Sequence, residues 1–311
     1  MSETQSQQER SLPEQIFLSP DEPRLRSGWR LLVQTIILLV LSVCFSIPLV
    51  VILVILDPSF IYSIPQIKPE AMLFAALAEF FVITLSVFLA VRFIDKRSIE
   101  SLGLKLNLQA LFDILAGIGI AFAQMGFIYL LMLGLGWLTF EGFAWEFDPL
   151  NVVIINVFLF FVIFIFVGWN EELLSRGYHL QTIASGLNLT WGIMISSAVF
   201  GLLHLGNPGA TWVSITGIFL AGIFLAYGYV RTKQLWLPIG LHIGWNFCEG
   251  VVFGFPVSGL DIYALTRIEV TGPEIWTGGA FGPEAGLIVL PSLIVGGILI
   301  YLYSANRNGN I

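Results

Sequence analysis

Residues 152–176 read VVIINVFLFFVIFIFVGWNEELLSR. An apolar run of membrane-spanning length leads directly into Glu171 and Glu172, and Arg176 follows the second glutamate by four residues. A spanning helix needs about 20 mostly apolar residues, and a carboxylate at the centre of such a helix costs roughly 2.5–3.5 kcal/mol on insertion scales. Two adjacent glutamates here therefore indicate a membrane helix that carries a polar site.

The composition of the whole chain agrees with a membrane protein. Of its 311 residues, 57% are hydrophobic and 11% are charged, whereas soluble domains carry about 25% charged residues. The sequence therefore excludes a soluble α/β enzyme and predicts an all-α polytopic membrane helix bundle. The net charge of −7 comes with no basic face for phosphate, so we expect no nucleic-acid partner. Cys44 and Cys248 lie in apolar runs and are expected to be small buried hydrophobic residues rather than a disulfide.

The apolar runs predict about eight transmembrane helices. Residues 1–27 are polar and are expected to form a disordered cytoplasmic tail. Residues 28–311 are expected to form a single transmembrane domain. No internal repeat is visible, so the paired-repeat architecture of many transporters is not expected. The predicted spans are 31–56, 71–93, 111–138, 152–174, 190–206, 211–230, 236–254 and 285–303.

Basic residues fall almost entirely on one side of this eight-helix topology. The other side holds only Lys68 and Arg267, among several acidic residues. By the positive-inside rule, this asymmetry places both termini in the cytoplasm. The basic residues on the predicted cytoplasmic side are Arg24, Arg26, Arg30, Arg92, Lys96, Arg97, Lys105, Arg176, Arg231, Lys233 and Arg307.

The glutamate pair has two interpretations. On a helix, Glu172 and Arg176 lie one turn apart and can form an ion pair along one face. Glu171 points about 100° away and can face a cavity. In the structural interpretation, the pair is an interfacial salt bridge at a helix end. In the functional interpretation, Arg176 holds Glu172 while Glu171 accepts a proton from water.

Two later runs supply further polar residues. His204 ends the fifth apolar run, and His242 lies within the seventh, where Asn246 one turn later shares its face. Each of the three is also explained by packing or by a hydrogen bond between helices. Because these polar groups occur together in otherwise apolar spans, the combination predicts a site within the membrane.

The depths of these residues raise a question about convergence. If the fifth helix begins near Trp191 at the cytoplasmic face, His204 lies about 20 Å into the membrane. Glu171, near the end of a helix that stops at residue 174, would be much shallower. Convergence then requires tilted helices, a deeper start of the fourth helix or water entering from the cytoplasm.

Three other acids lie in or beside apolar runs. Glu249 follows His242 by seven residues and is either an additional cavity carboxylate or a helix-end charge. Glu79 lies within the second run, where an interhelical hydrogen bond is the favoured explanation. Asp113 lies at the start of the third run.

The ordered motifs resemble those of a known family. Glu171-Glu172-x-x-x-Arg176, then Phe200-x-x-x-His204, then His242-x-x-x-Asn246 are similar to the motifs of the CPBP family. Its members include type II CAAX prenyl endopeptidases and bacterial proteins linked to bacteriocin processing or self-immunity. The resemblance covers a protease core of about residues 90–300. Lesser similarities lie at Arg97-Ser98 with Leu102-Gly103-Leu104, and at Gly278-Gly279-Ala280-Phe281-Gly282-Pro283-Glu284.

This resemblance implies an intramembrane protease. It implies that Glu171 activates the hydrolytic water with help from His204, while Glu172 and Arg176 orient the site. His242 and Asn246 would stabilise the oxyanion or help to hold a metal.

Neither the family resemblance nor the chemistry of the residues decides whether the site uses a metal ion. The family has been described both as metal-dependent and as glutamate-dependent without metal. Glu171, His204 and His242 are the candidate ligands of a divalent metal such as zinc, and a buried glutamate can equally act as a base without one. The His-Glu-x-x-His motif of many zinc proteases is absent from the sequence.

The expected function is hydrolysis of a peptide bond near the cytoplasmic leaflet. The substrates would be CAAX-like or other membrane-associated peptides or membrane proteins, and no residue pattern marks a prenyl-binding groove. The alternative is a non-enzymatic membrane protein, an immunity scaffold or a small-molecule transporter, whose polar residues serve stability or a proton relay. The expected location is a bacterial or archaeal plasma membrane.

Overall fold

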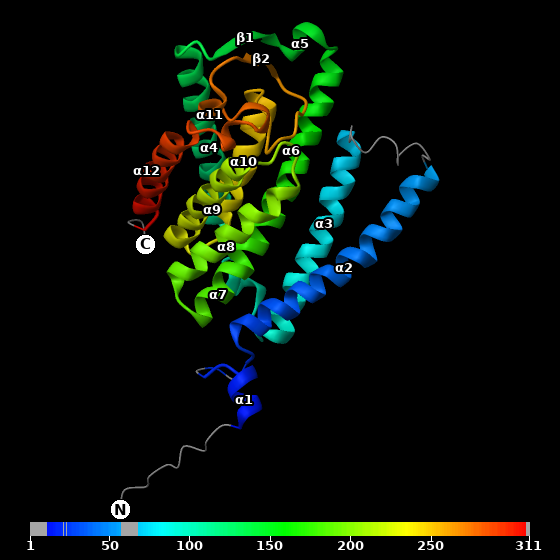
Figure 1. Ribbon diagram of the computed structural model, residues 1–311, viewed down its shortest axis with the longest axis vertical. Helices are drawn as coiled ribbons and strands as arrows, with labels where there is room; N and C mark the ends of the chain where they lie inside the picture. Colours follow the sequence, from blue (N-terminus) through cyan, green and yellow to red (C-terminus); the bar gives the residue numbers. More distant parts are fainter. Residues whose placement is uncertain (1–10, 21, 23, 57–67, 309–311) are drawn as a thin grey trace, which may run out of the picture.

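The computed structural model describes residues 11–308, apart from 21, 23 and 57–67 (Figure 1). Long apolar helices lie side by side and form the bundle, which confirms the predicted all-α membrane fold. In this part of the chain, seven helical stretches are long and apolar enough to cross a membrane. They contain α2 (Ser27–Leu56), α3 (Pro69–Leu89), α4 (Leu108–Gly134), α6 (Leu150–Glu172), α8 (Leu189–Leu203), α9 (Trp212–Thr232) and α12 (Val289–Asn308).

The predicted span at 236–254 has a different character from the other seven. It forms α10 (Trp236–Asn246) of only 11 residues, which continues as the π-helix η6 (Phe247–Val252) of 6 residues. Every residue of α10 is buried. A helix that is apolar on all sides belongs in the centre of a bundle, and α10 packs against α4, α6 and α9.

Glycines allow α4 and α10 to approach closely. A Cβ atom on Gly117 of α4 would lie 2.5 Å from the backbone nitrogen of Leu241. A Cβ atom on Gly240 of α10 would lie 2.3 Å from the carbonyl oxygen of Ile114. Small residues at helix crossings let two backbones pack directly in membranes. This contact fixes the position of α10, which carries His242 and Asn246.

The predicted end of the fourth span at residue 174 is wrong. After Glu172 the chain continues as the π-helix η4 (Leu173–His179) and then α7 (Leu180–Gly186). The helical stretch therefore covers Leu150–Gly186, 37 residues in all. The apolar pattern ends at the glutamates because this part of the helix is packed against protein, where polar residues have partners.

A small cap covers one end of the bundle and was not predicted from the sequence. Strands β1 (Leu138–Phe143) and β2 (Thr266–Val270) pair antiparallel, with an irregularity between Phe140 and Gly142. Figure 1 shows these two paired strands at the top of the view. The other short elements at this end are α5 (Ala144–Phe147), α11 (Glu274–Thr277), η7 (Gly279–Phe281) and η8 (Pro283–Ala285).

The opposite end holds the start of α2, the turn between α7 and α8 and the end of α12 (Figure 1). Within the predicted disordered tail, residues Leu12–Phe17 form the short helix α1. The remaining short elements described are η2 (Ala90–Ile94), η3 (Ile99–Leu102) and η5 (His204–Gly206). The orientation in the membrane and the division into a tail and a single domain remain predictions.

Asp113 has a structural explanation. It is fully buried in α4, and its carboxylate accepts hydrogen bonds from Gln109, Tyr303 and Arg307. Buried charges are stable when they are paired and hydrogen-bonded. Asp113 therefore joins α4 to α12 at the end of the bundle away from the cap.

The crossing of α4 and α10 can be tested with two alanine substitutions in the same helix. Gly117→Ala should lower stability by about 1–3 kcal/mol, because the added methyl group overpacks the contact. Gly119→Ala is the matched control, since no atom lies within 4 Å of a Cβ placed there. It should be neutral or slightly stabilising, by at most about 1 kcal/mol. The measurement is thermal unfolding of the purified proteins in detergent, and equal effects of both substitutions would contradict the close crossing.

Candidate active site

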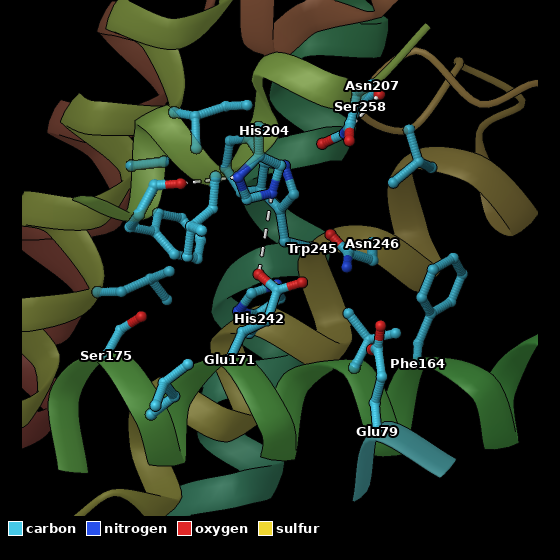
Figure 2. A pocket seen from close by; sticks show the side chains of 18 of the residues that line it. Glu79, Phe164, Glu171, Ser175, His204, Asn207, His242, Trp245, Asn246 and Ser258 are labelled. Atoms are coloured by element: carbon cyan, nitrogen blue, oxygen red, sulfur yellow. Dashed lines mark hydrogen bonds and ion pairs between the residues drawn. The ribbon is translucent and has the colours of Figure 1, made fainter. Parts of the chain in front are cut away.

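Three of the predicted site residues meet through their side chains. The Oε2 atom of Glu171 lies 3.7 Å from Nε2 of His242 and 3.9 Å from Nε2 of His204. Figure 2 shows Glu171 pointing from its helix toward His204, with His242 nearby. The three side chains come from α6, from α10 and from the end of α8. The structure therefore answers the question of depth that the sequence raised.

The long helix explains why Glu171 and His204 lie at the same level. Glu171 precedes Gly186, the end of α7, by 15 residues. His204 follows Leu189, the start of α8, by 15 residues. At 1.5 Å per residue, both lie about 22 Å from the turn that joins the two helices. No unusual tilt is required, because the helix that carries Glu171 does not end at residue 174.

Glu172 lies behind this meeting point and is fully buried. Its Oε1 atom accepts hydrogen bonds from Nη1 of Arg176 at 2.7 Å and from Nδ1 of His242 at 2.9 Å. Arg176 also donates from Nη2 to the carbonyl oxygen of Gly222, and its guanidinium group lies over the ring of Phe200. The predicted pairing of Glu172 with Arg176 is present and is extended by His242 across to α10.

The hydrogen bonds of the two histidines determine which ring nitrogens face the cavity. Nδ1 of His204 lies 2.8 Å from the carbonyl oxygen of Phe200, which can only accept, so this nitrogen carries the hydrogen. Nδ1 of His242 donates to the carboxylate of Glu172 in the same way. In neutral imidazole the second nitrogen is then a bare acceptor. Glu171 therefore faces two Nε2 lone pairs across distances too long for direct hydrogen bonds.

The residues surround a cavity of about 490 Å³. Its walls come from α2, α3, α6, α8, α9 and α10, and most of the side chains that line it are apolar. Asn246 lines it, as predicted from its spacing to His242. Glu79 of α3 also lines it, and Figure 2 shows its side chain on the wall. Sequence reasoning did not single out Asn207, Trp245 and Ser258 as wall residues.

Glu284 is a further wall residue whose role the sequence did not reveal. Its carboxylate accepts hydrogen bonds from Nε1 of Trp245 at 3.1 Å and from Oγ of Ser258. The available signal was its place after Gly278, Gly279 and Gly282, which all have positive φ angles and let the loop turn sharply.

Two π-helical segments flank the site. The first, η4, begins directly after the glutamate pair, and the second, η6, begins directly after Asn246. Such wide turns within helices occur frequently at functional sites. Glu249 lies in η6, fully buried, and does not line the cavity.

Glu171, His204 and His242 are the candidate ligands of a metal ion. Two imidazole nitrogens and a carboxylate oxygen are a chemically suitable donor set for zinc. Within the part of the chain that the structure describes, however, no group of three or more His, Cys, Asp and Glu side chains is arranged to hold a metal ion.

The comparison with known families rests on the segment that contains all seven motif residues. Residues 153–248 match the family described as Type II CAAX prenyl endopeptidase Rce1-like. The match confirms the resemblance to CPBP proteins, over a shorter segment than the predicted core of about 90–300. The match, together with the long apolar helices, supports an integral membrane protein of the protease class, with peptides in a membrane as the general class of substrate. Searches of curated proteins and of solved structures gave no match.

The buried pair of Glu172 and Arg176 should be essential for stability. Arg176→Met should destabilise the fold by about 3–5 kcal/mol, because it leaves the Glu172 charge buried and without its cation. Arg267→Met is the control, since Arg267 pairs with Asp148 where both side chains are about one-third exposed. That change should cost about 1 kcal/mol or less. The measurement is unfolding of both variants in detergent, and a smaller loss for Arg176→Met than for Arg267→Met would refute the assigned role.

Proposed function

We propose that this protein is an intramembrane endopeptidase in which Glu171 is the general base. The observation that supports this most is the position of the Glu171 carboxylate opposite two imidazole nitrogens that both present lone pairs. Three acceptors around one gap suit a water molecule, which donates two hydrogens and has a nucleophilic oxygen. Glu171 is also the one carboxylate of the pair with an exposed surface, at 32% of its side chain, whereas Glu172 is buried.

The proposed reaction is hydrolysis of a peptide bond. The water oxygen attacks the carbonyl carbon of the substrate while a proton of the water moves to Glu171. The negative charge on the former carbonyl oxygen is stabilised by the amide group of Asn246. The carbon–nitrogen bond then breaks, and the proton held by Glu171 passes to the leaving nitrogen. His204 assists by accepting a hydrogen bond from the water.

Glu172 and Arg176 have a positioning role in this proposal. Glu172 accepts the hydrogen on Nδ1 of His242 and so fixes which nitrogen of that ring faces the water. A carboxylate that orients a histidine in this way is a recurring part of hydrolytic sites. Arg176 in turn balances the charge of Glu172, so that the orienting carboxylate remains stable in a buried position.

The rival function, a scaffold or a transporter, accounts less well for these positions. A residue kept for stability is expected to have its charge paired, as Glu172 is by Arg176, whereas the closest ionisable partners of Glu171 are the two histidines at 3.7 and 3.9 Å. A proton relay across the membrane needs polar groups at both ends of the path. Most of the described cavity lining is apolar, which suits an extended peptide better than a relay.

The proposed location of the reaction is the cytoplasmic half of the membrane. Glu171 lies 21 residues from Leu150 and 15 residues from Gly186, so it is nearer the end of the helix where the turn to α8 lies. Arg30 donates a hydrogen bond to Ser185 near the end of α7, so the basic start of α2 lies on that same side, and the positive-inside rule assigns this side to the cytoplasm. A bacterial or archaeal plasma membrane remains the proposed membrane.

The role of Glu171 is tested by Glu171→Gln, which keeps the volume of the side chain and removes the base. Cleavage of membrane peptides should fall by at least about 100-fold, the usual contribution of a general base. The measurement compares membrane peptides by mass spectrometry in cells that produce the wild type or the variant at equal levels.

The matched control is Glu141→Gln, which changes an exposed glutamate of β1 in the cap. Its peptide pattern should equal that of the wild type. Cleavage by Glu171→Gln at the wild-type rate would eliminate the proposed base, and complementation of a gene deletion by both Glu171→Gln and His204→Ala would favour the scaffold.

The cofactor is tested by removing metal from the purified protein. Because the proposed base is the Glu171 carboxylate itself, cleavage should persist after a chelator has removed bound zinc. Elemental analysis should show that the zinc content is then far below one atom per protein chain. Loss of activity on chelation, with recovery on adding zinc, would overturn this mechanism in favour of a metal-bound water.

A further inference from the structure

The walls of the cavity carry an unbalanced set of charged groups. Three of the described residues that line it have carboxyl groups, namely Glu79, Glu171 and Glu284. None of the described lining residues is a lysine or an arginine. The nearest guanidinium group, that of Arg176, is directed to Glu172 and to the carbonyl oxygen of Gly222. A ligand in this cavity therefore meets acids without basic partners.

A second observation points to a ligand at one part of this wall. Glu249 is 0% exposed, and no geometric hydrogen bond joins either of its carboxyl oxygens to a described residue. The indole of Trp245, which also acts on Glu249, donates its hydrogen to Glu284 instead. The charged group that acts on Glu249 is another acid, Glu284. A Cβ atom on Gly282, two residues before Glu284, would lie 3.5 Å from Oε1 of Glu249. Glu249 therefore lies against the loop that carries Glu284, and Glu284 lines the cavity whereas Glu249 does not.

Such an arrangement is incomplete without a positive charge or a proton. A buried carboxyl group that lacks donors is costly to keep, and two acids beside one another increase that cost. Glu284 is held in place by Trp245 and Ser258 and interacts electrostatically with both His204 and His242. It lines the same cavity as Glu171, His204 and His242.

We propose that Glu284, with Glu249 behind it, binds a positively charged group of the peptide substrate. The inference rests on the proposed function and adds a substrate class, namely peptides that carry a lysine, an arginine or a free amino group close to the cleaved bond. A peptide that places a carboxylate in the same position is disfavoured, because it meets like charges and no cation.

The test measures binding apart from cleavage. Short apolar peptides with blocked ends carry a single lysine, norleucine or glutamate, and the position of that residue is varied along the peptide. Binding is measured by fluorescence on the full chain in lipid nanodiscs, with Glu171→Gln as the background so that no peptide is consumed. At one or two neighbouring positions, lysine should bind about tenfold more tightly than norleucine, and glutamate more weakly.

The variants assign this preference to its residues. Adding Glu284→Gln should bring the ratio of lysine to norleucine affinity close to one, whereas adding Glu141→Gln should leave the ratio unchanged. If the Glu284→Gln protein does not fold, Glu249→Gln provides the second variant, and it should lower the same ratio. Equal or weaker binding of lysine at every position, or a ratio that survives both substitutions, overturns the inference.

Cleavage of the same peptides by the wild type is recorded separately. A lysine preference in binding without cleavage of any peptide would contradict the proposed function and support the binding site. Cleavage without a lysine preference would support the protease and contradict the site.

Discussion

The structure depends on a buried hydrogen-bond network in which Glu172 binds both Arg176 and His242. These three residues belong to η4, α6 and α10, and the two contacts of Glu172 measure 2.7 and 2.9 Å. A carboxylate with no exposed surface is stable here only because both neighbours donate to it. The helices that carry them cannot separate without exposing an unpaired charge to an apolar surrounding, so the same contacts that stabilise the bundle also orient the ring beside Glu171.

Close packing of the central helix supports this arrangement. All residues of α10 are buried, and direct backbone contact with α4 at Gly117 and Gly240 leaves it little freedom to shift. The position of His242 is therefore fixed from two sides, by a polar contact to Glu172 and by steric contact to α4. Preorganised groups of this kind are what a hydrolytic site requires, because they need little reorganisation during the reaction.

Much of this architecture could be predicted from the sequence, for identifiable reasons. Apolar runs report exposure to lipid, so the seven lipid-facing spans were visible and α10, which is short and enclosed, was grouped with them. The helix beyond Glu172 was missed because Arg176 and His179 interrupt the apolar pattern, although protein surrounds them. The two-stranded sheet was not predicted because its strands are more than a hundred residues apart in the sequence.

The sequence predicted several of the polar residues that line the cavity but not the elements around them. Motif spacing indicated Glu171, His204, His242 and Asn246, whereas the place of Glu284 depends on a loop that three glycines fold back toward the bundle. Glu249 shares a helix face with His242, yet its burial behind Glu284 follows from the π-helical turns of η6. Loop geometry and helix irregularities of this kind are decided by tertiary contacts rather than by local sequence.

The equal distance of Glu171 and His204 from the turn at Leu187 and Asn188 limits how this protein can change during evolution. One residue inserted into α7 would move the helix that carries Glu171 by about 1.5 Å and rotate it by about 100° relative to α8, which leads to His204. Such an insertion separates the Glu171 carboxylate from the His204 ring even if every motif residue is retained. Substitutions that keep the buried contacts of Glu172 and Arg176 preserve this geometry, whereas a change of length within either helix does not.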